Sequence, residues 1–375
     1  MGQTMRVVAI AKALQRRGHD VTFIAAGKLI PIIKDFGITV ISSSHMPDTG
    51  NLYSQQNLAV SPAEMMLKMQ EFLDKVRTIE IETIKTVQPD IVISGTLTGS
   101  QAAQQAGLPS VLVFLQPHGE KTVAMFSSKM QNKTTMLSFL AAANLIILEG
   151  MPEISGSATF DNHALTFLKS KLRFTGPLLT EYPEQLPERA ELKQLYIGDS
   201  HKVMLYITIG GGSALIGEDF LKQVLDCLKL LPDVTGIIAT GIATPPEIIN
   251  KYQPSSNVII RGFVPGTEMI KASDITIFHG GSSTLMTCIA CGTPAIIVPS
   301  MGEQEDNGAV LAQNGAGIVL DKQTLTGEKL ASAVREILQH SAYRTSAQQL
   351  QTIGKKYGGA DAAATLIEQV GKGAL

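Results

Sequence analysis

The sequence predicts an α/β protein of two doubly wound domains that face each other across a cleft, each built on a parallel β-sheet with helices on both faces. Short apolar runs rich in β-branched residues alternate with longer segments of helical period along the 375 residues. This alternation is typical of parallel sheets that are covered on both sides. The pattern also restarts after a charged segment at 175–200 that contains three prolines, and the length leaves room for two domains.

The first half of the chain opens with a helix, on which Val7, Ile10 and Leu14 recur at helical spacing. A doubly wound domain normally opens with a strand. We therefore expect the first strand of this domain to be missing, and we favour a truncated gene or a gene model that starts too far downstream. The remaining elements expected here are a long helix at 64–87 and strands at 21–25, 38–41, 91–93, 111–115 and 145–148.

The second half repeats the pattern. Strands are expected at 203–209, 236–239, 258–260, 275–278, 295–298 and 317–320, with helices between them and two or three more within 327–370. This organisation predicts an amino-terminal domain at 1–176, a linker at 177–200 and a carboxyl-terminal domain at 201–345. The final helices, at 346–375, are free to pack back on the amino-terminal domain. Ligands are expected in the cleft between the carboxyl edges of the two sheets.

Composition and charge exclude several classes of protein. Lysine and arginine number 31 against 33 aspartates and glutamates, a formal charge of −2, so a nucleic-acid-binding protein is not expected. No apolar run reaches the ~18 residues of a membrane-spanning helix, although contact with a membrane surface stays open. Three cysteines cannot form a disulfide framework, which suits the cytoplasm. Cys288 and Cys291 lack the second pair that a zinc site requires, so no metal site is expected.

The most informative motif follows the strand expected at 275–278. His279 precedes the glycine pair Gly280 and Gly281, and the hydroxyl residues Ser282, Ser283 and Thr284 then open a helix. Free backbone N–H groups at a helix start, together with the helix dipole, form an anion site that suits a diphosphate. Taken alone, the motif is equally compatible with an ordinary strand-to-helix turn.

A second motif follows the strand expected at 295–298. Glu303 and Gln304 stand side by side near the carboxyl end of this strand, and Asn307 follows them. A carboxylate and a carboxamide can accept hydrogen bonds from, and donate them to, the neighbouring hydroxyls of a sugar. The alternative is that Glu303 and Gln304 are ordinary solvated residues at the start of a helix.

Together these motifs resemble the donor domain of nucleotide-sugar-dependent glycosyltransferases with the GT-B fold, which pairs two Rossmann-like domains. The branch resembled is the UDP-glycosyltransferase, macrolide and sterol glycosyltransferase family (family 1). The residues that carry the resemblance are Gly262-Phe263-Val264-Pro265, Ala272-Ser273-Asp274, His279-Gly280-Gly281, Gly292-Thr293-Pro294, Glu303-Gln304, Asn307, Gly315 and Gly317. The resemblance implies transfer of a hexose-type sugar from a nucleoside diphosphate, most commonly UDP, to a hydroxyl acceptor bound by the amino-terminal domain. It also implies inversion of the anomeric centre without a bound metal or other cofactor.

The resemblance assigns a role to each motif. Phe263 and Val264 would meet the base, and Glu303 and Gln304 the sugar hydroxyls, while Asn307 would support the loop. The diphosphate would be held by Gly211, Gly212, Ser213, His279, Gly280, Gly281, Ser282, Ser283 and Thr284.

Two positions depart from the family pattern. Thr287 stands where the family usually has a glutamate that binds the ribose, so it would offer a neutral hydrogen bond in place of a charge-assisted pair. Gln3 stands where many relatives carry a histidine general base, and a glutamine cannot take up a proton at neutral pH. The candidate base is then His118, which follows the strand expected at 111–115.

Two alternatives to a transferase remain open from the sequence. A nucleotide-sugar 2-epimerase would share the architecture, but it would need acidic residues to handle protons at the sugar ring. A non-catalytic relative that acts as a partner or activator of another transferase would explain Thr287, Gln3 and the missing first strand. The sequence names neither the acceptor nor the oligomeric state.

Overall fold

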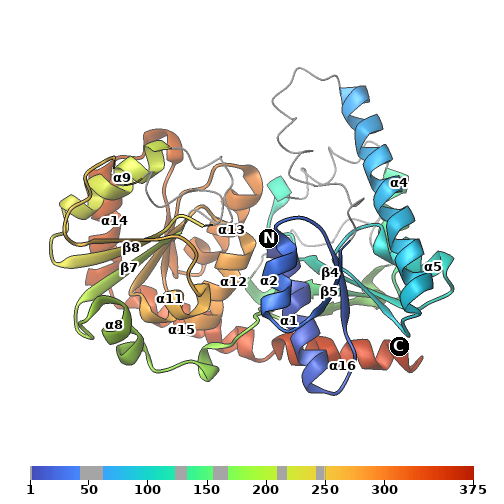
Figure 1. Ribbon diagram of the computed structural model, residues 1–375. Helices are drawn as coiled ribbons and strands as arrows, with labels where there is room; N and C mark the ends of the chain where they lie inside the picture. The colour runs from blue at the N-terminus through green and yellow to red at the C-terminus, as the bar shows by residue number, and fades with distance from the viewer. Residues whose placement is uncertain are drawn as a thin grey trace.

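The computed structural model describes residues 2–42, 62–122, 133–154, 168–208, 218–241, 249 and 251–375. These residues form two α/β domains that lie side by side (Figure 1). Every strand pair among them is parallel, so the predicted fold class is confirmed. Within the described ranges, no helix is long and apolar enough to cross a membrane.

The amino-terminal domain contains two parallel sheets, one of two strands and one in the order β3-β4-β5-β6. Its strands are β1 (Thr22–Ala25), β2 (Thr39–Ser42), β3 (Val92–Ser94), β4 (Ser110–Leu115), β5 (Leu145–Glu149) and β6 (Leu172–Phe174). Its helices include α1 (Gly2–Arg16), α2 (Leu29–Asp35), α4 (Pro62–Val87), α5 (Gly99–Gln105) and α7 (Lys133–Ala142). Each predicted strand is present within two residues of its expected bounds. β6 was not predicted, because its three residues are only partly buried and Arg173 interrupts the apolar run.

The division of the amino-terminal strands into two sheets matches the expected lack of a first strand. In the doubly wound order 3-2-1-4-5-6 the first strand lies between the second and the fourth, which are β1 and β3 here. Among the described residues, β1 pairs only with β2, and β3 only with β4. Helix α1 keeps its place over the larger sheet, where Val7, Ile10 and Leu14 pack with residues of β4 and β5.

The carboxyl-terminal domain has one six-stranded parallel sheet in the doubly wound order β12-β11-β10-β7-β8-β9. Its strands are β7 (Val203–Thr208), β8 (Val234–Ala239), β9 (Val258–Arg261), β10 (Ile275–Phe278), β11 (Ala295–Ile297) and β12 (Gly317–Val319). Helices α9 (Glu218–Lys229) and α14 (Gly327–Gln339) cover one face, and α11 (Gly266–Ala272), α12 (Ser282–Cys291), α13 (Gly302–Gln313) and α15 (Ala342–Lys355) the other. The strand order reverses between β7 and β10, and in open sheets of this kind ligands bind at the carboxyl end of that switch point.

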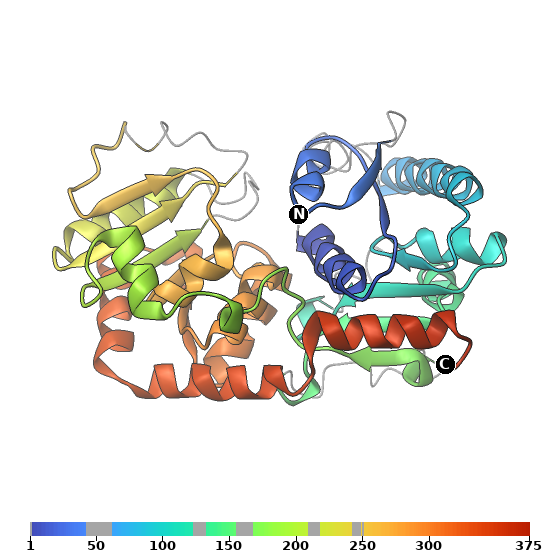
Figure 2. The same cartoon turned by 60° about the horizontal axis from the view of Figure 1, so that its bottom comes forward.

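The chain passes between the domains twice. After β6 it enters the carboxyl-terminal domain through a segment that holds α8 (Arg189–Ile197), whose Leu192 is buried in the core shared by α11 and α12. It returns to the amino-terminal domain in the segment that joins α15 to α16 (Gly359–Gly371). Helix α15 packs on α12, and α16 packs on α1. Figure 2 shows α15 and α16 along the lower edge of both domains. Ala363, Ala364 and Ile367 of α16 belong to the amino-terminal core.

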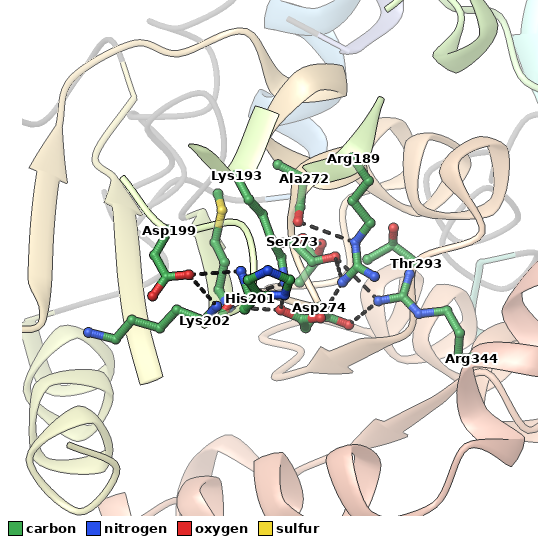
Figure 3. A network of polar contacts seen from close by, with 12 residues as sticks. Arg189, Lys193, Asp199, His201, Lys202, Ala272, Ser273, Asp274, Thr293 and Arg344 are labelled. Atoms are coloured by element: carbon green, nitrogen blue, oxygen red, sulfur yellow. Dashed lines mark hydrogen bonds and ion pairs between the residues drawn. The ribbon is translucent and has the colours of Figure 1, made fainter. Parts of the chain in front are cut away.

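A partly buried ion network holds α8 and α15 to the sheet of the carboxyl-terminal domain, at the amino end of the strands and away from the cleft (Figure 3). Asp274 accepts a hydrogen bond from the Met204 backbone N–H at 2.8 Å and forms ion pairs with Arg189 and with Lys193, the latter at 2.7 Å. Arg344 of α15 donates to the Asp274 carbonyl at 2.7 Å. Asp274, part of the family resemblance, therefore links β7, α8 and α15 to the start of β10.

Replacing Asp274 by alanine is expected to lower the free energy of unfolding by about 3 kcal/mol, because Lys193 would remain buried without its partner. Burial opposes ionisation of Asp274, but Arg189, Lys193 and the Met204 N–H outweigh it and hold the pKa of the carboxyl below its ordinary value. The stabilisation is therefore fully present above the unfolded-state pKa of about 4 and is lost as the pH falls through the lower folded-state pKa. Urea unfolding of wild type and Asp274→Ala between pH 7 and pH 3 measures both effects. If the difference in free energy of unfolding between wild type and Asp274→Ala stayed constant from pH 7 to pH 3, the ionised Asp274 carboxylate would not be the source of the stabilisation.

Candidate functional site

The loop after β10 makes a tight turn at the switch point of the carboxyl-terminal sheet. Gly280 has φ +90°, a backbone conformation that residues other than glycine rarely adopt. A Cβ atom at this position would lie 2.6 Å from the Gln304 carbonyl oxygen of α13. Asn307 is 1% exposed, and its side-chain amide donates to the Gly280 carbonyl at 2.8 Å. Helix α13 therefore fixes this loop through the Asn307 amide and through the close approach of the Gln304 carbonyl.

Helix α12 begins at the cleft without a side-chain cap. Its N-cap is Gly281, which has no side chain to accept from the first-turn N–H groups. Ser282, Ser283 and Thr284 form this first turn and are partly exposed. Uncapped N–H groups and the positive end of a ten-residue helix together attract an anion. The first turn of α12 can thus bind a diphosphate group.

His279 lies beside this turn as a neutral donor. Burial lowers the pKa of its imidazole to about 4, so the ring is uncharged at neutral pH. Its Nε2 atom lies next to Gly281, since a Cβ there would be 2.8 Å away. The buried Nδ1 atom has no hydrogen-bond partner among the described residues. The ring can therefore donate one hydrogen bond toward an anion on the first turn without adding a charge.

The two residues expected to bind the sugar occupy different environments in α13. Gln304 is 7% exposed, and its side-chain oxygen accepts from the Ser300 backbone N–H at 2.8 Å. Glu303 is partly exposed in the first turn of the helix. Glu303 is thus partly exposed, whereas the Gln304 side-chain oxygen holds the loop after β11.

The residues expected near the base are only partly brought together. Phe263 is 68% exposed and lines a shallow groove with Pro31, Ile32 and Phe36 of the amino-terminal domain. Val264 packs against the core beneath α12. Thr287 is 7% exposed, and its hydroxyl donates to the Ser283 carbonyl within the helix at 2.9 Å. The other residues expected at the diphosphate, Gly211, Gly212 and Ser213, lie outside the described residues.

A loop of the amino-terminal domain contacts α13 directly. Asp306 accepts from the backbone N–H of Thr122 at 2.6 Å and from its hydroxyl at 2.7 Å. Gly119 lies so close that a Cβ there would be 2.5 Å from the Asp306 carboxyl carbon. Lys121 and Glu305 form an exposed ion pair alongside. These contacts bring the loop that carries His118 against the donor half of the cleft.

His118 is buried in this loop, with 8% of its surface exposed. Burial, and to a lesser extent the charge of Arg6, lower the pKa of its imidazole to about 4. The ring is therefore neutral at pH 7, and a base of this pKa is weaker than an ordinary histidine.

Helix α1 supplies a second contact between the domains. Arg6 is 3% exposed and forms an ion pair with Glu149, at the end of β5, which is 2% exposed. Its Nη2 atom donates to the Ser282 hydroxyl, in the first turn of α12, at 2.7 Å. A charged side chain of one domain therefore reaches the anion-binding turn of the other.

Comparison with known proteins agrees with this geometry. Residues 206–366 match the glycosyltransferase family 28 C-terminal domain. An uncharacterised glycosyltransferase of Methanosarcina acetivorans is 27% identical over 99% of this chain and 96% of its own length. The NDP-glycosyltransferase YjiC of Bacillus subtilis is 24% identical over 98% of this chain and 94% of its own. The carboxyl-terminal domain thus matches a glycosyltransferase domain, and the chain is similar to glycosyltransferases over nearly its full length.

A solved structure shows the same fold over nearly the full length. The glycosyltransferase SsfS6 of Streptomyces sp. SF2575, complexed with thymidine diphosphate, superimposes with a TM-score of 0.69 and 19% identity over 97% of this chain and 96% of its own. The solved glycosyltransferase and this chain therefore share the same fold across both domains.

Sequence reasoning missed two residues of the glycosyltransferase site. Neither Arg6 nor Asp306 stands out in the sequence as a candidate site residue. A buried arginine beside the apolar positions of α1 is a signal that could have drawn attention to Arg6, because buried charges require partners. Asp306 carries no such signal, since its partner Thr122 is 184 residues away.

Proposed function

We propose that this glycosyltransferase moves a hexose-type sugar from a UDP-sugar to a hydroxyl acceptor, with inversion of the anomeric centre and without a bound metal or other cofactor. The observation that supports it best is the uncapped first turn of α12. This turn follows the tight loop at Gly280, at the switch point of the sheet. An anion site in this place suits the diphosphate of a nucleotide sugar. The neighbour with thymidine diphosphate makes a pyrimidine nucleotide a reasonable first ligand to test.

The proposed chemistry follows from where charge develops. As the bond between the anomeric carbon and the diphosphate breaks, the leaving oxygen gains negative charge. The N–H groups of the first turn of α12, and His279 as a neutral donor, would stabilise that charge without reorganising. Glu303, partly exposed at the start of α13, would accept hydrogen bonds from hydroxyls of the sugar.

The acceptor would enter from the side of the amino-terminal domain. The loop that follows β4 contacts α13 through Thr122 and Asp306, and it carries His118. We assign to His118 the role of base that takes the proton of the acceptor hydroxyl as the hydroxyl oxygen attacks the anomeric carbon. With its pKa lowered to about 4, His118 can take this proton only while the bond to the diphosphate is breaking, because the acceptor is then a stronger acid.

Calorimetric titration with UDP tests the donor site. We expect the wild type to bind UDP with a micromolar dissociation constant, and His279→Ala to weaken binding about tenfold, the value of one hydrogen bond to a charged group. His340→Ala is the matched control, because this histidine is exposed on the far side of the domain, at the end of α14. Affinity equal to wild type in His279→Ala would remove His279 from the site. Absence of binding by UDP, dTDP and GDP would contradict the proposed function.

Turnover distinguishes the transferase from the alternatives. A transferase releases free UDP only when an acceptor is present, and it does so equally in EDTA if no metal takes part. An epimerase converts the nucleotide sugar without acceptor, whereas a non-catalytic partner binds UDP and turns over nothing. The anomeric configuration of the product, read from proton couplings by NMR, tests inversion.

A further inference from the structure

Arg6 is held in one orientation by partners on three sides. Its Nε atom is paired with Glu149, whose other oxygen accepts from the Leu178 backbone N–H at 2.9 Å. Its Nη1 atom donates to the Gln3 side-chain oxygen at 3.0 Å, and the Gln3 amide nitrogen in turn donates to the Val113 carbonyl at 2.6 Å. The guanidinium plane is thus fixed by α1, β4 and β5 before it meets the other domain.

The remaining Nη2 atom points out of the amino-terminal domain. It donates to the Ser282 hydroxyl at 2.7 Å, and Ser282 is the first residue of α12. Glu149 accepts from Nε and Ser282 from Nη2, so the two contacts use different N–H groups of the guanidinium. The Arg6 guanidinium therefore lies against the first turn of α12, and both side chains of the ion pair are 3% exposed or less.

The loop and first helical turn at 279–284 offer only neutral donors to a diphosphate. Residues 279–284 contain no lysine, arginine, aspartate or glutamate, and burial keeps His279 uncharged at neutral pH. A nucleoside diphosphate carries two to three negative charges, and the leaving diphosphate carries more negative charge in the transition state than in the bound sugar nucleotide. A fixed guanidinium directed at this turn would supply what the loop itself lacks.

We propose that Arg6 completes the diphosphate site from the amino-terminal domain: its Nη2 atom donates to a phosphate oxygen held on the first turn of α12. This rests on the proposed function, because it takes the ligand of that turn to be a nucleoside diphosphate. It adds that the amino-terminal domain binds the donor as well as the acceptor. Donor binding then favours the closed arrangement of the two domains, since Arg6 reaches the phosphate only when α1 and α12 are together.

A series of ligands with and without phosphate separates this role from a structural one. Calorimetry with UDP, and NMR titration with uridine, are compared in wild type and Arg6→Lys, which keeps the charge but loses the fork that holds Glu149 and Ser282 together. We expect UDP affinity to fall about tenfold and uridine affinity to change less than about twofold. Arg16→Gln is the matched control, because Arg16 lies on the same helix but is exposed and paired with Asp361.

A second variant guards against unfolding. Arg6→Gln alone would leave Glu149 buried and unpaired, so Arg6→Gln combined with Glu149→Gln removes both charges at once. This double variant is expected to lose at least as much UDP affinity as Arg6→Lys, with uridine binding retained.

The outcomes are distinguishable. Equal losses for UDP and uridine would make Arg6 a structural residue, and unchanged UDP affinity in both variants would overturn its role at the phosphate. Either result leaves the proposed function standing if the wild type binds UDP. A wild type that binds no nucleoside diphosphate would instead refute the proposed function, and this inference with it.

Discussion

Replacing Gly280 by alanine is expected to weaken UDP binding by about a hundredfold, the effect of some 3 kcal/mol. Gly280 has φ +90°, and an added Cβ would lie 2.6 Å from a backbone carbonyl oxygen of α13, which cannot turn aside as a flexible side chain could. The loop must then adopt another conformation, and the binding-competent one becomes a minor state. Apparent affinity falls in proportion to that population. Calorimetric titration of UDP into Gly280→Ala measures the loss.

Gly266→Ala is the control for this substitution. Gly266 is the first residue of α11 in the same domain, and a Cβ there would have no heavy atom within 4 Å. We expect UDP affinity within about twofold of wild type and no loss of stability, since alanine is the better helix former. Thermal unfolding of both variants shows whether the domain stays folded. A folded Gly280→Ala protein that binds UDP as wild type does would mean that this loop does not hold the diphosphate.

Replacing Asp306 by alanine is expected to lower turnover about thirtyfold while the dissociation constant of UDP stays within about twofold. The Asp306 carboxylate accepts both the N–H and the hydroxyl of Thr122, and two such hydrogen bonds to a charged group together contribute about 2 kcal/mol. They hold the loop with His118 against the donor half of the cleft. Without them the donor still binds, but the acceptor side is no longer positioned. Steady-state rates with a saturating donor, together with UDP calorimetry, separate these two effects.

The neighbouring pair of Lys121 and Glu305 provides the matched control for Asp306. It joins the same loop to the same helix, but both side chains are more than 40% exposed. Exposed ion pairs contribute little, so Glu305→Gln is expected to change turnover less than about twofold. If Glu305→Gln and Asp306→Ala were to slow turnover equally, general charge on α13 rather than the hydrogen bonds of Asp306 would hold the loop. If Asp306→Ala were to lower UDP affinity as much as turnover, Asp306 would belong to the donor site.

Most of the strands could be predicted because they are buried on both faces. In the carboxyl-terminal sheet, Leu205 and Ile207 pack on one side and Met204 and Tyr206 on the other, so the whole run must be apolar and is visible as a block. β6 (Leu172–Phe174) escaped prediction because it is short and only partly buried.

The site was predictable where its chemistry is local. Gly280, Gly281 and the hydroxyl residues after them are adjacent in the chain, and the backbone of that turn supplies the N–H groups of the proposed anion site. Thr287 shows the limit of this reasoning: its position suggested contact with the ribose, but it is buried and its hydroxyl donates to a carbonyl of its own helix. A hydrogen bond four residues back along a helix satisfies a threonine wherever the side chain is buried.

By itself, the sequence determined two parallel-sheet domains, the switch-point loop at 279–284 and the family resemblance, because periodicity and glycine-rich turns are properties of neighbouring residues. Only the tertiary structure decided which side chains of the amino-terminal domain reach the donor half. Arg6 meets Ser282 across 276 positions, and Thr122 meets Asp306 across 184. No local pattern specifies such contacts, because they depend on how the two finished domains pack. Arg6 has its ionic partner Glu149 within the amino-terminal domain, but its contact with Ser282 forms only when the two domains pack together.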